Sequence, residues 1–126
     1  MKEIFVFGSN LSGIHGAGAA RIAREHHGAI WGQGEGLQGD SYALPTKGLN
    51  ITFMPYNQVK KHVHTFLKFA ADHPELEFKV TRIGCGLAGF KDENIAPLFN
   101  EAPNNCSFDD EWYLHMVDGK NYWGTV

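Results

Sequence analysis

The segment Ile4-Phe-Val-Phe7 leads directly into Gly8-Ser-Asn-Leu-Ser-Gly-Ile-His-Gly-Ala-Gly18, so an apolar run is followed by a glycine-dense loop. The continuous apolar run predicts a buried strand over residues 3–8. The residues from Ala17 to His27 predict a short helix, which ends where Gly28 favours left-handed backbone. Glycines let a ligand approach the backbone, and peptide N–H groups at a helix start present partial positive charge. The loop is therefore suited to an anion such as a phosphate.

A second unit of the same kind lies further along the chain. Phe78-Lys-Val-Thr-Arg-Ile83 predicts a strand over residues 77–83, and the turn Gly84-Cys-Gly-Leu-Ala-Gly89 follows it before a helix. The turn matches the pattern G-x-G-x-x-G. The sequence offers no good candidate for the acidic ribose-binding residue expected about twenty residues further on, at the end of a next parallel strand, which argues against a Rossmann dehydrogenase. The narrower prediction is that the backbone of this turn donates hydrogen bonds to an anion. A tight strand-to-helix turn without a ligand is the alternative.

Composition and length bound the protein further. The 126 residues fit one domain, with a core over residues 3–114 and a C-terminal tail over 115–126. A formal net charge of −3 with interspersed charges argues against an extended nucleic-acid groove. No apolar stretch approaches the ~20 residues that span a bilayer, and no signal peptide is recognisable, so we expect a cytoplasmic protein without a membrane role. Cys85 and Cys106 fit a reducing compartment, although the sequence leaves a single disulfide open.

The remaining segments alternate between strand and helix patterns, which indicates an α/β architecture. An apolar stripe from Val59 to Ala70 predicts a helix that ends before Pro74. Pro97 predicts that the next helix, around residues 95–99, starts late or kinks. Short strands are expected at residues 29–31, 42–44, 50–54 and 106–114, and a tail at residues 118–126.

Four further features have weaker interpretations. The pattern at Gly34, Gly36 and Gly39 leads into a strand, so it indicates a mobile flap or a turn rather than a phosphate loop. The flap is either a polar lid over a sugar, through Gln33, Glu35 and Gln38, or a loop without a ligand. Adjacent or i,i+2 histidines diverge on a helix, so no metal site is expected at His26, His27, His62 and His64. The aromatic residues near the C-terminus are expected to cover a sheet edge or a partner interface rather than to stack on a base. They are Trp112, Tyr113, Tyr122 and Trp123.

Three motifs in order resemble the macro domain, an ADP-ribose-binding α/β fold. They are Gly8-Ser-Asn-Leu with Gly13 to Ala20, Ser41-Tyr-Ala-Leu-Pro-Thr-Lys47, and Thr81-Arg-Ile-Gly-Cys-Gly-Leu-Ala-Gly-Phe90 with Asn94-Ile-Ala. The resemblance covers residues 4–100 and is nearest to the branch that contains the terminal ADP-ribose protein glycohydrolase and the antitoxins that remove ADP-ribose from DNA. It implies a three-layer α/β/α fold with a mixed central sheet, shortened at the N-terminus.

The resemblance also implies ligand-binding positions. Asn10 would lie near the distal ribose, the loop at Gly16 would face the phosphates, and the second turn would wrap the diphosphate. Phe90 would pack against a sugar or a base. The full implied set is Gly8, Ser9, Asn10, Gly16, Ala17, Gly18, Ile83, Gly84, Cys85, Gly86, Leu87, Ala88, Gly89 and Phe90.

Two candidate catalytic residues follow. Lys47 matches the lysine that acts on the anomeric carbon in the glycohydrolase branch, a role that requires desolvation to lower its pKa; a solvated turn lysine is the alternative. His15 among glycines is either a general base or phosphate ligand, or a surface histidine. The acidic residue that follows the glycine motif in the resembling hydrolases is replaced here by Ala88. A substitute carboxylate would have to come from Asp92, Asp40 or Glu35.

These observations lead to one main expectation and two alternatives. The main expectation is a domain, without a cofactor, that binds ADP-ribose or a related nucleotide diphosphate sugar. Its partner would be ADP-ribose or an ADP-ribosylated substrate, and an enzymatic version would hydrolyse an ADP-ribose derivative. The alternatives are a non-catalytic reader or scavenger of such nucleotides and an interaction module with a degenerate pocket. The oligomeric state stays open.

Overall fold

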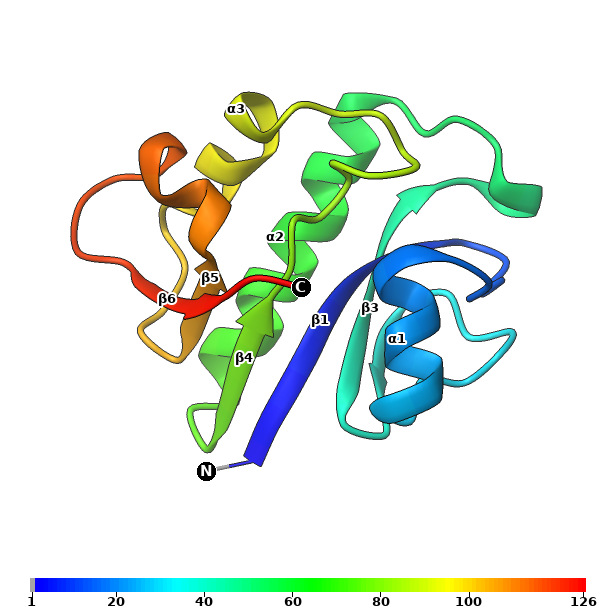
Figure 1. The fold of residues 1–126 in the computed structure, drawn as a ribbon, viewed down its shortest axis with the longest axis horizontal. Coiled ribbons are helices and arrows are strands. Elements are labelled where there is room, and N and C mark those ends of the chain that lie inside the picture. The colour runs from blue at the N-terminus through cyan, green and yellow to red at the C-terminus, as the bar shows by residue number, and fades with distance from the viewer. Residues whose placement is uncertain (1) are drawn as a thin grey trace.

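A computed structural model describes residues 2–126, and Figure 1 shows its central sheet between helical layers. The sheet has the strand order β2-β3-β1-β4-β5-β6. The strands are β1 (Lys2–Asn10), β2 (Gly36–Gln38), β3 (Ser41–Lys47), β4 (Leu76–Val80), β5 (Cys106–Asp109) and β6 (Asn121–Gly124). The helices are α1 (Gly18–His26), α2 (Tyr56–Asp72) and α3 (Asp92–Ile95), with 3-10 helices η1 (Leu49–Ile51), η2 (Ala96–Phe99) and η3 (Asp110–His115).

The sheet is mixed, as expected. The hairpin strand β2 runs antiparallel to β3, whereas the other neighbouring strands are parallel. Parallel strands end at the same edge of a sheet, so β1, β3, β4, β5 and β6 bring the loops that follow them to one side. The two glycine-rich segments follow β1 and β4, which are adjacent strands. The sheet topology therefore places them next to each other.

The two faces of the sheet carry separate cores, which confirms the three-layer α/β/α arrangement. Successive residues of β1 point to opposite faces, so Phe5 and Phe7 pack under α1 while Ile4 and Val6 pack under α2. Figure 1 shows α1 and α2 on opposite sides of the sheet. Both faces of β1 are covered, and this accounts for its continuous apolar sequence. The α2 face holds the larger aromatic cluster, which includes Phe66, Phe78, Phe99, Phe108 and Trp112.

The expected strand at residues 29–31 is wrong. Ile30 and Trp31 are exposed, and the Arg24 guanidinium lies over the Trp31 ring. The Ile30 N–H donates to the Gln38 side-chain oxygen at 2.7 Å. A side chain therefore satisfies the backbone donor that a strand neighbour would otherwise take, and the short strand β2 forms later, within the segment expected to be a flap.

The expected strand at residues 50–54 is also replaced, by η1 and a turn. Asn50 and Ile51 have φ values of 56° and 61°, in the left-handed region. This conformation is costly for a β-branched residue such as Ile51, and it prevents an extended strand. Among the described residues 2–126, one isolated antiparallel bridge, between Lys47 and Phe53, joins this segment to the end of β3. The predicted helices are otherwise confirmed in α1 and α2, and the helix around Pro97 is divided into α3 and η2.

The C-terminal residues differ most from expectation. The strand expected over residues 106–114 stops at Asp109, whose carboxylate accepts the Glu111 N–H at 2.9 Å and starts η3. The expected tail contains β6, which pairs in parallel with β5 and completes the sheet. The Trp123 indole N–H donates to the Val80 carbonyl at 2.9 Å, which ties β6 to β4. Among residues 2–126, no helix is both long and apolar enough to cross a membrane.

Candidate functional site

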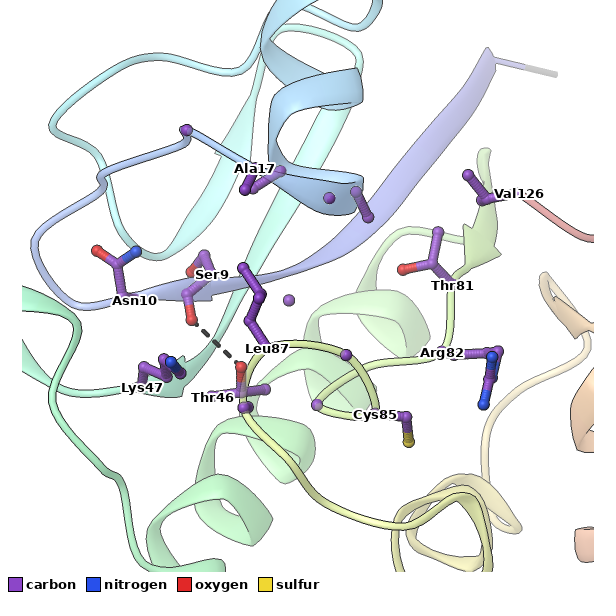
Figure 2. Close-up of a pocket in the computed structure, with 18 of the residues that line it drawn as sticks. Ser9, Asn10, Ala17, Thr46, Lys47, Thr81, Arg82, Cys85, Leu87 and Val126 are labelled. Atoms are coloured by element: carbon purple, nitrogen blue, oxygen red, sulfur yellow. Dashed lines mark hydrogen bonds between the residues drawn. The ribbon is translucent and has the colours of Figure 1, made fainter.

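A cavity of about 470 Å³ opens at the carboxyl edge of the sheet, where both glycine-rich loops meet (Figure 2). Residues 16–20 form one wall, and residues 84–88 form another. The ends of β1 and β3 lie between them, and the ends of β4, β5 and β6 continue the wall. The expected convergence of the two loops on one cavity is therefore present in the structure.

The first loop presents the start of α1 to the cavity. Gly18, Ala19 and Ala20 are the first residues of this helix, and their N–H groups have no acceptor among residues 2–126. No side chain caps the helix, and no acidic residue stands in its first turn. Unpaired N–H groups at a helix start carry the positive end of the helix dipole. This wall therefore presents partial positive charge to the cavity.

The second loop folds back on itself through backbone hydrogen bonds. The Cys85, Gly89 and Phe90 N–H groups donate to Arg82, Gly86 and Gly84 carbonyls at 3.1, 3.0 and 2.9 Å. This pattern leaves three consecutive cavity-lining N–H groups, on residues 86–88, without an acceptor in the described chain. The second wall therefore also presents unpaired peptide N–H groups to the cavity.

Two glycines on the walls are not required by the protein itself. A Cβ built at Gly16 or Gly86 meets no atom within 4 Å, and neither residue has a φ in the left-handed region. A Cβ would therefore fit at either position as far as the described chain is concerned. Their lack of a side chain instead keeps the cavity walls open for close approach to the backbone.

Three of the implied ligand-binding residues lie outside the cavity. Ile83 is fully buried in the α2-side core, and Gly89 does not line the cavity. Phe90 turns away because its N–H closes the loop onto Gly84, and its ring lies 6.4 and 6.3 Å from the rings of Phe53 and Tyr56. The expectation that Phe90 packs against a ligand is therefore not met in this structure.

His15 has a structural environment rather than a catalytic one. The side chain is fully buried, packs edge-on against Phe7 and does not line the cavity. Its Nε2 lies 3.0 Å from the Gln33 carbonyl oxygen, so Nε2 carries the proton and donates. Nδ1 has no partner among residues 2–126. The structure therefore does not bring His15 to the place where a base would act.

Lys47 and Asn10 do lie at the cavity, opposite each other at the ends of β3 and β1. Lys47 is half-buried, and its ammonium forms no ion pair within residues 2–126. The Asn10 amide donates to the Ile14 carbonyl at 2.9 Å and accepts from the Ile14 N–H at 3.0 Å. Asn10 therefore shapes the first loop, and Lys47 is the more available of the two side chains.

None of the three suggested carboxylates replaces the missing acid. Asp40 pairs with Lys2 at the opposite end of β1, and Glu35 contacts the His62 imidazole at 2.6 Å. Asp92 accepts from Arg82 at 2.9 and 2.6 Å and from the Trp112 indole at 2.7 Å. All three lie off the cavity wall. Each of these carboxylates is bound to another side chain through a tertiary contact, which sequence spacing does not reveal.

The Arg82–Asp92 pair predicts a pH dependence of stability. Hydrogen bonds from Arg82 hold the pKa of the Asp92 carboxyl at about 2, below its usual 3.8. A lowered folded-state pKa stabilises the fold above the unfolded-state pKa, and that contribution is lost as the pH falls through the folded-state value. We expect the stability difference between wild type and Asp92→Asn, measured by urea unfolding, to shrink between pH 4 and pH 2. Glu93→Gln, an exposed change on the same helix, serves as the control; an unchanged Asp92→Asn difference would contradict the assignment.

Cys85 lines the cavity without the properties of a nucleophile. Burial, with the Asp92 carboxylate nearby, raises the pKa of its thiol to about 12. The thiolate is the reactive form, so this raised pKa disfavours a nucleophilic role for Cys85 at neutral pH. Cys106 is buried, and both cysteines are free. The packing interpretation of Cys85 therefore agrees with its environment.

The cavity contains polar residues that the sequence did not single out. Thr46 and Thr81 are buried, and their hydroxyls donate to the Ser9 and Val6 carbonyls. Asp109 and Thr125 join them from β5 and the segment after β6. A polar residue at the carboxyl end of an apolar strand is a usable signal, and Asp109 after Cys106-Ser-Phe108 fits it. Thr125 had no such signal, because its position depends on a strand that was expected to be a tail.

The weaker sequence features have structural roles. Gln38 is buried and bonds backbone groups of Ile30, Gln33 and Gly36, so it organises the 30–38 segment. Within residues 2–126, no group of three or more His, Cys, Asp or Glu side chains is arranged to hold a metal ion. Trp112 is fully buried in the core, whereas Tyr113 is exposed and packs against Tyr122.

The fold and site together define an α/β/α domain whose sheet edge carries a cavity between two glycine-rich loops with unpaired peptide N–H groups. No protein-family model, no curated protein and no solved structure matches the chain.

Proposed function

We propose that the cavity binds ADP-ribose or a related nucleotide diphosphate sugar. The observation that carries this proposal is the convergence of two sets of unpaired peptide N–H groups, at residues 18–20 and 86–88, on one cavity. Two separated sets of donors suit a ligand with two linked phosphates better than a single small anion. The volume of about 470 Å³ lies within the usual range for small-molecule sites. The resemblance of the motifs to the macro domain supports the same ligand class.

Calorimetric titration tests this proposal directly. ADP-ribose, ADP, a uridine diphosphate sugar and inorganic phosphate are titrated into the protein under the same conditions. We expect ADP-ribose or another diphosphate sugar to bind, and inorganic phosphate to bind far more weakly because it reaches only one set of donors. Absence of heat with every nucleotide would overturn the proposal and favour an interaction module with a degenerate pocket.

Hydrolysis of an ADP-ribose derivative is the second candidate function, favoured by the position of Lys47 on the cavity wall. Such a reaction would add water across the bond between the anomeric carbon and the attached group. The one Asp or Glu on the wall within the described residues, Asp109, ends β5. Three strand-to-strand steps separate β3 from β5, roughly 14 Å at about 4.8 Å per step. The two groups would not act on one carbon, so binding is the stronger proposal.

Replacement of Lys47 by alanine separates the two candidates. If the protein is a hydrolase, Lys47→Ala should reduce the release of ADP-ribose from an ADP-ribosylated substrate by tenfold or more, since a positioned catalytic group contributes at least that much. Lys60→Ala, an exposed change on α2 away from the cavity, should keep full activity. If the wild-type protein binds ADP-ribose but releases none from any substrate, it is a non-catalytic reader rather than a hydrolase. Equal turnover of Lys47→Ala would remove this lysine from the mechanism.

A further inference from the structure

Large apolar side chains are exposed beside the mouth of the cavity. We call Ile51, Phe53, Tyr56 and Leu87 the mouth patch. Phe53 is 74% exposed and Leu87 is 73% exposed. Ile51 and Leu87 line the cavity, one from the segment between β3 and α2 and the other from the second glycine-rich loop. Contiguous apolar surface on a folded domain is typical of a place where a partner binds.

The Phe90 ring joins the two segments that contribute the mouth patch. It lies 6.4 Å from the Phe53 ring and 6.3 Å from the Tyr56 ring. The Phe90 N–H donates to the Gly84 carbonyl, so the ring is fixed to the loop that carries Leu87. Figure 1 shows the segment between β3 and α2 beside this loop. The mouth patch is therefore one surface that extends outward from the cavity, rather than a set of scattered side chains.

A strained backbone holds Ile51 at the cavity. Its φ of 61° is in the left-handed region, which is costly for a β-branched residue. The segment is held by hydrogen bonds from the Asn50 N–H to the Ser12 hydroxyl at 2.8 Å and from the Thr52 hydroxyl to the Leu49 carbonyl at 2.7 Å. Strain of this kind clusters at ligand-binding positions, where it serves function. The strain at Ile51 therefore indicates that its apolar side chain is placed at the mouth for binding.

Charge decides between the two classes of macromolecule that could lie on the mouth patch. Residues 48–59 contain no Asp, Glu, Lys, Arg or His. Beyond Phe90, Lys91 is followed by Asp92 and Glu93, so basic residues do not cluster there. A nucleic acid carries one phosphate per nucleotide and needs several basic side chains to bind it. An apolar segment of polypeptide needs none, and aromatic side chains are enriched in protein interfaces.

We infer that the mouth patch docks an apolar segment of a polypeptide that carries the nucleotide diphosphate sugar. This inference rests on the proposed function and names the class of macromolecule to which the ligand is attached. The nucleotide occupies the cavity, and the polypeptide leaves it on the Lys47 side, where Ile51 lines the opening. Phe53 forms the isolated bridge with Lys47, and its exposed ring supplies the main contact outside the cavity.

The test compares three ligands by calorimetry. They are free ADP-ribose, a short peptide ADP-ribosylated at a central residue between leucines and phenylalanines, and the same peptide with serines and glycines in place of these apolar residues. Wild type should bind the apolar peptide about tenfold or more tightly than the other two ligands, because burial of one large apolar side chain contributes about that much. Release of ADP-ribose is followed in the same samples, so that turnover is not read as weak binding.

Three variants locate the effect. Phe53→Ser removes a ring that does not line the cavity, so it should abolish the advantage of the apolar peptide and leave the affinity for free ADP-ribose unchanged. Leu114→Ser changes an exposed apolar residue of η3 away from the cavity and should bind all three ligands as wild type does. Ile51→Asn suits the left-handed backbone, so it should stay folded in urea at least as well as wild type while the advantage of the apolar peptide shrinks.

The failure of this inference differs from the failure of the proposed function. If wild type binds no form of ADP-ribose, the proposed function fails and the inference fails with it. If wild type binds free ADP-ribose and the apolar peptide equally, or if Phe53→Ser keeps the advantage of the peptide, the docking surface is overturned while the proposed function stands. An ADP-ribosylated single-stranded DNA oligonucleotide is titrated in parallel. If it binds more tightly than the peptide and loses this affinity in Phe53→Ser, the ring stacks on a base and the assignment to a polypeptide is wrong.

Discussion

Replacement of Gly86 by valine should weaken ADP-ribose binding at least a hundredfold while the protein stays folded. The new side chain would occupy open space at the cavity wall, since a Cβ at this position meets no protein atom within 4 Å. It would keep a phosphate away from the unpaired N–H groups of residues 86–88. A hydrogen bond to a charged group contributes about 1.5–3 kcal/mol, so the loss of two such bonds accounts for the effect.

The stability of the Gly86 variants should change in the opposite direction to affinity. Gly86→Ala should raise the free energy of unfolding by about 0.4–1 kcal/mol, because alanine restricts the unfolded chain and the native backbone accommodates it. The affinity of this smaller variant should lie between those of wild type and Gly86→Val. Titration calorimetry and urea unfolding on the same preparations measure both quantities.

Two further glycines provide matched comparisons. Gly16→Val, on the facing loop, should reproduce the loss of binding, because this position is equally open. Gly32→Ala lies off the cavity and has a φ of 93°, so it should cost about 1–2 kcal/mol of stability and leave the affinity within about twofold. Unchanged affinity in both valine variants would show that the glycine-rich loops do not hold the ligand.

Local sequence patterns were sufficient to predict the strands and helices that determine where the cavity lies. The apolar run in β1 and the stripe on α2 predicted these elements, because each depends on burial of its own side chains. The two glycine-rich loops follow adjacent parallel strands, so the α/β pattern already placed both at one sheet edge. The unpaired N–H groups on both walls agree with the sequence interpretation of these loops.

Long-range contacts determine what the sequence did not predict. The strand β6 exists because it pairs with β5, and its own sequence, Asn121-Tyr-Trp-Gly124, carries no clear strand pattern. Thr125 therefore reaches the cavity without a local signal, whereas Asp109 ends the short apolar run of β5. The same limit applies to Asp92, whose carboxylate stands near the glycine-rich turn in sequence but is held by Arg82 and Trp112.

His15 and Phe90 show why residue type within a loop is a weak guide to function. Both residues belong to the glycine-rich loops that border the cavity, yet both side chains pack away from it. His15 supports the loop at Gln33, and Phe90 packs near Phe53 and Tyr56. A loop that exposes its backbone to a ligand needs its larger side chains as anchors on the protein side.

Replacement of Trp112 by alanine should lower the free energy of unfolding by about 3–5 kcal/mol, as expected when a buried aromatic side chain is truncated. Trp112 is fully buried, and its ring lies 5.3 Å from that of Phe99 and 6.2 Å from that of Phe108. Its indole N–H also donates to the Asp92 carboxylate at 2.7 Å. In the variant Asp92 loses this hydrogen bond and keeps those from Arg82. The loss is a large fraction of the roughly 5–15 kcal/mol that stabilises a domain of this kind.

Urea unfolding of Trp112→Ala, Trp112→Phe and Tyr113→Ala separates the two contributions of this side chain. Trp112→Phe keeps much of the packing and removes the indole donor, so it should cost about 1–3 kcal/mol. Tyr113 is adjacent but 65% exposed, so Tyr113→Ala should change stability by about 0.5 kcal/mol or less. A loss in Trp112→Ala no larger than that in Tyr113→Ala would show that η3 does not belong to the core. In that case the Trp112 indole would also not be what holds the Asp92 carboxylate in place beside Arg82.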